Sequence, residues 1–245
     1  MKQIKIEQHG KVTLFTINRL ERKNAICQDT ALELQAGFAE FDASDQLVAV
    51  ITGAGNEVFS SGADVSNIPE LWRCVPGSGI TTEKPIIAAT AGWVIGGAVV
   101  VAMMCDLLVA AENTKFYYPE AKVGFTGGMI AGLAARIPHK VAMDIMLRCR
   151  TVDAKRAYEV GLVSEITPVG KQVEVALQQA EEMTHSAPLV LRTLKRFVNQ
   201  YVMPKGPSER MAEALRQLKA VNESNDSKEG VAAFKEKRKP VYTGR

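Results

Sequence analysis

Residues 86–105 read IIAATAGWVIGGAVVVAMMC, twenty residues without a charged side chain. A membrane-spanning helix needs about 20 predominantly apolar residues, so length alone leaves the stretch ambiguous. Four of its residues weaken a continuous helix, namely Thr90, Gly92, Gly96 and Gly97. We therefore predict a buried strand over 85–90, a loop over 91–96 and a buried helix that begins at Gly97. This division accounts for every glycine and favours a protein that does not cross a membrane.

The flanking sequence has the pattern of an α/β protein. Residues 4–17 alternate around His9-Gly10, which predicts a β-hairpin, and the spacing Thr30-x-x-Glu33 predicts a capping box that opens a helix. Continuous apolar runs over 47–51 and 106–110 are typical of strands covered on both faces. We expect a helix of ordinary length after each strand, hence parallel pairing with helices on the faces of the sheet.

Composition excludes several classes of protein. The chain has 245 residues, of which 47% are hydrophobic and 23% charged, and its net charge is +3. This charge is too small to predict binding to nucleic acid or to an anionic membrane. The four cysteines lack C-x-x-C spacing and the three histidines lie far apart, so we expect no metal site. The N-terminal residues lack the apolar core of a signal peptide, which favours a soluble cytoplasmic protein.

Two glycine turns indicate a site that binds negative charge. Gly96-Gly97 opens the predicted helix, where backbone N–H groups have no intrahelical partner. A second turn, over 59–65, follows the strand near residue 50. Ligands of α/β sheets bind beyond strand ends, so two convergent N–H donors there would form an oxyanion hole.

Four segments in order carry a resemblance to a known family. They are NRLERKNAI at 18–26, FSSGADVSNI at 59–68, AGWVIGGAVVVAMMCDLLVAAENTKFYYPEAKVG at 91–124 and AYEVGLVSEI at 157–166. Together they resemble the crotonase, or enoyl-CoA hydratase/isomerase, superfamily over essentially the whole chain. The resemblance implies an α/β fold, a crotonase-type spiral of ββα units over 1–187, with a helical C-terminal trimerisation region over 188–245. It also implies a homotrimer or hexamer.

The resemblance further implies an acyl-CoA thioester as substrate, with coenzyme A as part of it, and no permanently bound cofactor. Ala63 and Gly97 correspond to the two backbone donors that hold the thioester oxygen. Glu120 corresponds to the catalytic acid and base, although without the resemblance it would be taken for a surface carboxylate. Asp106 corresponds to a structural acid, which we expect to cap the entry of a strand or to pair with a basic residue.

The resemblance also implies further contacts with the substrate. The stretch lining acyl-CoA corresponds to Ala63, Asp64, Val65 and Ser66, together with Gly96 and Gly97. The segment beside the CoA nucleotide and pantetheine corresponds to Arg22, Lys23 and Ala25. The basic pair would meet phosphates there, and solvated surface charge is the alternative interpretation.

One departure from the family bears on the reaction. Hydratases carry a second glutamate in the helix after Gly97, and Val100 stands at that position. A single glutamate suits double-bond isomerisation, which is therefore our favoured prediction. Hydration, hydrolysis and decarboxylation remain alternatives, as does a catalytically weak acyl-CoA-binding homologue. An RNA-binding homologue has only the small excess of basic residues in its support.

Overall fold

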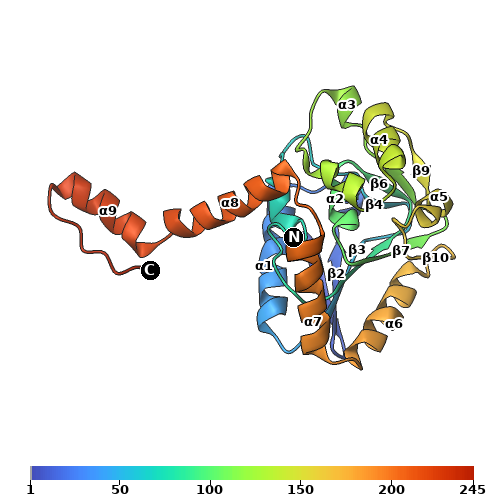
Figure 1. Cartoon of the computed structure of the whole chain (residues 1–245), viewed down its shortest axis with the longest axis horizontal. Helices are drawn as coiled ribbons and strands as arrows, with labels where there is room; N and C mark the ends of the chain where they lie inside the picture. Colours follow the sequence, from blue (N-terminus) through green and yellow to red (C-terminus); the bar gives the residue numbers. More distant parts are fainter. Residues whose placement is uncertain (1) are drawn as a thin grey trace.

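The computed structural model describes residues 2–245, and across these residues it contains a six-stranded sheet and a four-stranded sheet (Figure 1). The larger sheet has the order β1 (Ile4–His9), β2 (Val12–Ile17), β3 (Val48–Gly53), β5 (Ile86–Thr90), β7 (Leu107–Ala111) and β10 (Glu165–Thr167). The smaller sheet has the order β4 (Val58–Ser60), β6 (Trp93–Ile95), β8 (Lys115–Tyr117) and β9 (Val152–Asp153). The predicted β-hairpin is confirmed as the antiparallel pair β1–β2.

Each turn of the spiral contributes one strand to each sheet. Strands β3, β5 and β7 pair in parallel, and each is followed by a short strand of the smaller sheet, β4, β6 or β8. The predicted α/β fold is confirmed, and so is the start of helix α2 (Gly97–Met103). The expectation of an ordinary helix after every strand is wrong, because three-residue strands take that place after β3, β5 and β7. The predicted loop over 91–96 accordingly contains β6.

The central strands are apolar throughout because both of their faces are covered. All six residues of β3 are buried. Ala49 and Ile51 belong to the larger core cluster, which includes the buried face of α1 (Gln28–Ala43). Val48 and Val50 belong to a second cluster on the opposite face, under α6 (Gln172–Thr184). The sheet is therefore sandwiched, as continuous apolar runs predict.

The predicted capping box is wrong. Helix α1 begins at Gln28, two residues before Thr30, and within the described chain no side chain caps its N-terminus. The Glu33 carboxylate instead accepts hydrogen bonds from the backbone N–H groups of Gln3 and Ile4, at 2.8 and 3.0 Å. These contacts fasten the edge strand β1 to α1. The Thr-x-x-Glu spacing arises here from a tertiary contact and not from a helix cap.

The structural role predicted for Asp106 is confirmed. Its Oδ2 atom accepts a hydrogen bond from the backbone N–H of Ile86, the first residue of β5, at 2.7 Å. The same oxygen accepts from the Lys195 ammonium at 2.7 Å. Lys195 lies on α7 (Pro188–Phe197), so this carboxylate ties the C-terminal helices to the larger sheet.

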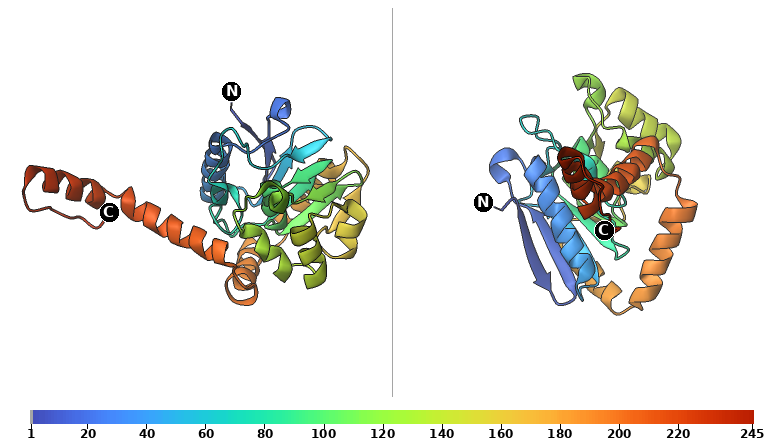
Figure 2. Two further views of the ribbon diagram at one scale, coloured as in Figure 1. Left: turned by 90° about the horizontal axis from the view of Figure 1, so that it is seen from above. Right: turned by 90° about the vertical axis from the view of Figure 1, so that its left-hand side faces the viewer.

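The C-terminal helices leave the body of the molecule. After α7 and a π-helical turn over Val198–Val202, helices α8 (Pro207–Asn222) and α9 (Asn225–Glu236) form an arm. Figures 1 and 2 show α8 starting against the body and α9 standing clear of it. The other helices are α3 (Glu120–Val123), α4 (His139–Arg148) and α5 (Ala154–Glu159). Among residues 2–245 no helix combines the length and apolar character needed to cross a membrane.

Candidate active site

Two glycine turns meet at the carboxyl end of the smaller sheet. Strands β4 and β6 pair in parallel, and the turns at Gly62 and Gly96 follow them. A Cβ atom on Gly62 would lie 2.6 Å from the carbonyl oxygen of Ile95 and 3.3 Å from the amide nitrogen of Gly97. Gly62 and Gly96 also have φ values of +88° and +57°. Glycine is required at both positions because the two backbones touch and both bend through the left-handed region.

No described residue accepts a hydrogen bond from the backbone amide of Ala63 or of Gly97. Ile26 donates to the carbonyl of Gly62 and accepts from the amide of Asp64, at 2.8 and 2.9 Å. N–H directions alternate along an extended chain, so the amide of Ala63 points away from Ile26. Gly97 is the first residue of α2, where the N–H group has no intrahelical partner. Both residues line one cavity, and their role as oxyanion donors stays a prediction.

The carboxylate of Glu120 lies beside these amides. Glu120 is the first residue of α3, and its Oε1 would be 2.8 Å from a Cβ atom on Gly96. Burial raises the pKa of Glu120 to about 7. Its Oε2 atom is buried and has no hydrogen-bond partner among the described residues. A carboxyl group that titrates near neutral pH and retains a free oxygen is suited to accept and return a proton.

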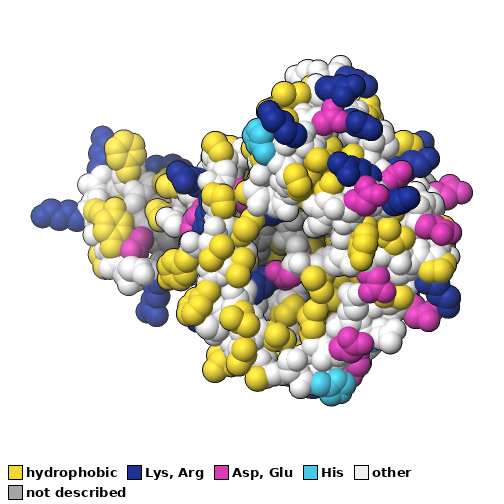
Figure 3. Space-filling view, turned by 45° about the vertical axis from the view of Figure 1, so that its right-hand side comes forward, with side chains coloured by type: hydrophobic (Ala, Val, Ile, Leu, Met, Phe, Trp, Pro, Cys, Tyr) yellow, Lys and Arg dark blue, Asp and Glu magenta, His cyan; other side chains and the backbone are white. Residues whose placement is uncertain are grey.

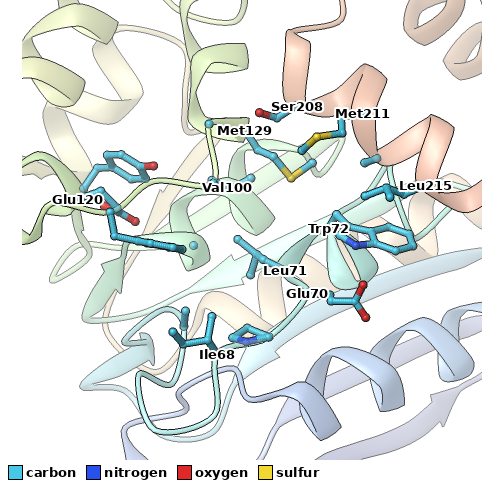
Figure 4. Close-up of a pocket in the computed structure, with 18 residues that line it drawn as sticks. Ile68, Glu70, Leu71, Trp72, Val100, Glu120, Met129, Ser208, Met211 and Leu215 are labelled. Atoms are coloured by element: carbon cyan, nitrogen blue, oxygen red, sulfur yellow. The ribbon is translucent and has the colours of Figure 1, made fainter.

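A largely apolar cavity of about 220 Å³ joins these groups (Figure 4). Glu120 and Val100 line it from the spiral core, and Leu71 and Trp72 line it from the loop after β4. Helix α8 supplies four further lining residues that were not predicted from the sequence: Ser208, Met211, Ala212 and Leu215. The apolar face of α8 was the available signal, but sequence spacing does not say which surface such a face will cover.

The other predicted substrate contacts surround the cavity without lining it. Asp64 forms an ion pair with Arg19 at 3.1 Å and accepts hydrogen bonds from the backbone and hydroxyl of Ser66. Val65 is 90% exposed in the same loop. The structure therefore places these three side chains at the rim of the site, with Ala63 and Gly97 inside it.

The basic segment lies next to the first glycine turn. The carbonyl of Lys23 accepts a hydrogen bond from the amide of Ser61 at 3.0 Å, while the side chains of Arg22 and Lys23 are exposed. Ala25 is buried. Asn24 holds the turn through hydrogen bonds to the carbonyls of Ala54 and Val58, at 2.9 and 2.8 Å. Contact of Arg22 and Lys23 with CoA phosphates stays a prediction.

No cluster of three or more His, Cys, Asp or Glu side chains suited to a metal ion occurs within residues 2–245. Besides backbone amides, the acidic groups that line the described cavity are the carboxyls of Glu120 and Glu70.

Comparisons with known proteins show the family to which the chain belongs. The family model for enoyl-CoA hydratase/isomerase matches residues 7–245. A probable enoyl-CoA hydratase from Mycobacterium bovis is 32% identical, with 99% of this chain and 98% of that protein covered. A carnitinyl-CoA dehydratase from Citrobacter koseri is 32% identical, with 97% of each chain covered. The crystal structure of carnitinyl-CoA hydratase from Mycobacterium avium matches with a TM-score of 0.79 and 31% identity over 100% of both chains.

The fold and the site define a crotonase-fold enzyme that acts on CoA thioesters. The chain belongs to the enoyl-CoA hydratase/isomerase family.

Proposed function

We propose that this enzyme moves the double bond of an enoyl-CoA thioester through an enolate. The Glu120 carboxylate takes a proton from C2 of a 3-enoyl thioester, and the carbonyl oxygen gains negative charge. The N–H groups of Ala63 and Gly97 stabilise that charge. Glu120 then returns the proton at C4, which gives the 2-enoyl thioester.

The observation that carries the proposal is the single unpaired acid in the described cavity. The cavity contains two carboxylates, Glu120 and Glu70, and Glu70 pairs with Arg73 at 2.7 Å. Val100, at the position where the family resemblance puts a second glutamate, is 2% exposed and lines the same cavity. Valine neither accepts a proton nor orients water, so one carboxyl group must perform both proton transfers.

Hydration is the second candidate, because relatives at 32% identity are named enoyl-CoA hydratase and carnitinyl-CoA dehydratase. Mass spectrometry in deuterated water separates the two, with 2-enoyl, 3-enoyl, 3-hydroxyacyl and malonyl-type CoA esters as substrates. Isomerisation converts a 3-enoyl into a 2-enoyl ester of the same composition and is detected by the deuterium taken up from solvent, whereas hydration adds one whole water. Hydrolysis and decarboxylation each give their own product mass. Binding of the esters without exchange or product would contradict the proposal and favour a catalytically weak homologue.

The rate is expected to rise with pH. The pKa of Glu120 lies at about 7 because its carboxyl is buried, and the carboxylate form is the one that takes the first proton. For 3-enoyl ester, kcat/KM should therefore be low at pH 5, half-maximal near pH 7 and level above pH 8, because this ratio reports the pKa of the free enzyme. A midpoint close to 4.5, the usual pKa of a glutamate side chain, would show that Glu120 is not desolvated in solution.

We also propose that the protein is a homotrimer, alone or paired into a hexamer, assembled through residues 188–245. Figure 3 shows hydrophobic side chains on a face that continues from the body onto the arm. The large exposed apolar side chains of this region include Leu189, Leu194, Phe197, Tyr201, Leu218 and Phe234. Exposed apolar patches of this extent mark association surfaces.

The assembly is tested by light scattering after size-exclusion chromatography. The wild-type protein should have three or six times the mass of one chain, and the double variant Leu218→Asp, Phe234→Asp should have a lower mass. The double variant Glu112→Gln, Glu159→Gln, at exposed positions outside the arm, is the control. A monomeric wild-type protein would contradict the proposal.

A further inference from the structure

The cavity has a reactive end and a far end. In Figure 4, Glu120 lies at one end of the lining, and Trp72, Leu215 and Glu70 lie at the other. If the proposed function is right, Glu120 fixes the position of the thioester. The group at the end of the acyl chain then lies against Trp72 and Leu215.

The far end contains the two elements that bind a quaternary ammonium, an aromatic ring and a carboxylate. Trp72 supplies the ring and Glu70 the carboxylate. Relatives of similar identity differ in the acyl group for which they are named, enoyl-CoA in one case and carnitinyl-CoA in another. A carnitinyl group ends in a trimethylammonium cation, whereas a simple enoyl group ends in a hydrocarbon.

Arg73 already engages both elements. Its guanidinium carbon lies 4.8 Å from the centroid of the Trp72 ring. Its Nε atom donates to Glu70 at 2.7 Å, and the hydrogen bond from Arg73 is the main cause that holds the pKa of Glu70 below its usual value. Arg73 is 9% exposed, and a second nitrogen donates to Gln35 at 3.1 Å, so the guanidinium is held in place.

Apart from Glu70, no acidic side chain lines the described cavity near Trp72 and Leu215 to balance the charge of a bound cation. Leu71, which lies between Glu120 and Trp72 in Figure 4, lines the middle of the cavity with hydrocarbon. Met129, Met211 and Leu215 add apolar lining on the side of α8, where Ser208 also lies. A trimethylammonium group there would lose its hydration against apolar side chains. The Arg73 guanidinium, held on Trp72 and Glu70, would repel it.

We infer that the cavity takes an acyl group with an uncharged hydrocarbon end, and that Arg73 is the residue that excludes a quaternary ammonium. Arg73 acts through Glu70 and Trp72 and does not itself line the described cavity. Its positive charge neutralises the carboxylate and occupies the ring, which leaves only apolar contacts for the substrate.

The test uses two saturated CoA esters of one shape, which bind but cannot isomerise. One ester ends in a trimethylammonium group, and in the other a quaternary carbon replaces the nitrogen. Isothermal titration calorimetry on the full-length protein should give a dissociation constant at least about tenfold lower for the neutral ester. Equal affinity, or tighter binding of the charged ester, would overturn the inference.

Two variants that each remove one charge make the test specific to the charge pair. Arg73→Gln leaves the Glu70 charge and the Trp72 ring free, so the preference for the neutral ester should fall by about tenfold. Glu70→Gln leaves the guanidinium uncompensated, so the preference should increase. Each preference is a ratio measured on one protein preparation, so partial loss of folded Arg73→Gln protein does not affect it. An unchanged ratio in Glu70→Gln, whose side chain is half exposed, would also count against the inference.

Different results would contradict the role of Arg73 and the proposed isomerase function. If the wild-type protein binds neither ester, the assignment to acyl-CoA is lost. If it binds both esters equally and isomerises a 3-enoyl ester, the proposed function stands and only the role of Arg73 is wrong.

Discussion

Turnover of a 3-enoyl-CoA ester is expected to fall about a thousandfold when Glu120 is replaced by glutamine, because general acid–base catalysis contributes factors of this size. The amide has the shape of the carboxyl group but cannot accept the proton from C2. Binding of the thioester should change by less than about threefold, because the proposed donors to its carbonyl oxygen are backbone amides, which the substitution leaves in place.

Steady-state kinetics and calorimetry with a saturated ester measure the two effects separately. Glu112→Gln is the matched control, since Glu112 is an exposed glutamate in the turn between β7 and β8. The control should keep wild-type turnover. If Glu120→Gln also keeps it, Glu120 is not the acid and base. If Glu120→Gln instead loses ester binding, the carboxyl group holds the substrate as well.

The second large effect is expected from Gly97→Pro, which removes one proposed oxyanion donor. Gly97 is the first residue of α2, a position where proline fits the helix and where the N–H group is not needed within it. The substitution should lower kcat by about 10²–10³-fold, the usual cost of one such donor. The new side chain must displace the Leu71 methyl groups, 2.8 and 3.0 Å from a Cβ atom at this position.

Gly97→Ala separates the loss of the N–H donor from the new contact with Leu71. Alanine introduces the same Cβ atom against Leu71 but keeps the N–H group, so the ratio of kcat between the alanine and proline variants measures the donor. Circular dichroism establishes that both variants are folded. Equal kcat in the two variants would mean that the amide of Gly97 does not stabilise the transition state.

Local spacing was sufficient to predict part of the fold. The runs around Val50 and Val109 predicted strands covered on both faces, and the glycine pair predicted a helix starting at Gly97. The buried strands follow from the burial of consecutive residues, and the helix start follows from the backbone freedom of glycine. Both properties can be recognised in a short stretch of sequence. The order of four family segments added the spiral arrangement and the role of Asp106.

Spacing misled where a side chain serves a distant segment. Glu33 had the position of a helix cap, yet it binds the backbone of β1. The three-residue strands of the smaller sheet were missed because so short a run has no measurable period. Such strands form because neighbouring turns of the spiral supply their hydrogen-bond partners.

The sequence by itself therefore determined the class of fold, the family and the residues proposed to carry the chemistry. Only the tertiary structure decided the environment of those residues: the burial that raises the pKa of Glu120 and the closure of the cavity by α8. It also placed Glu70 and Trp72 in the lining of that cavity. The physical reason is that desolvation and charge pairing depend on which distant segments exclude water from a group, and spacing along the chain does not specify this.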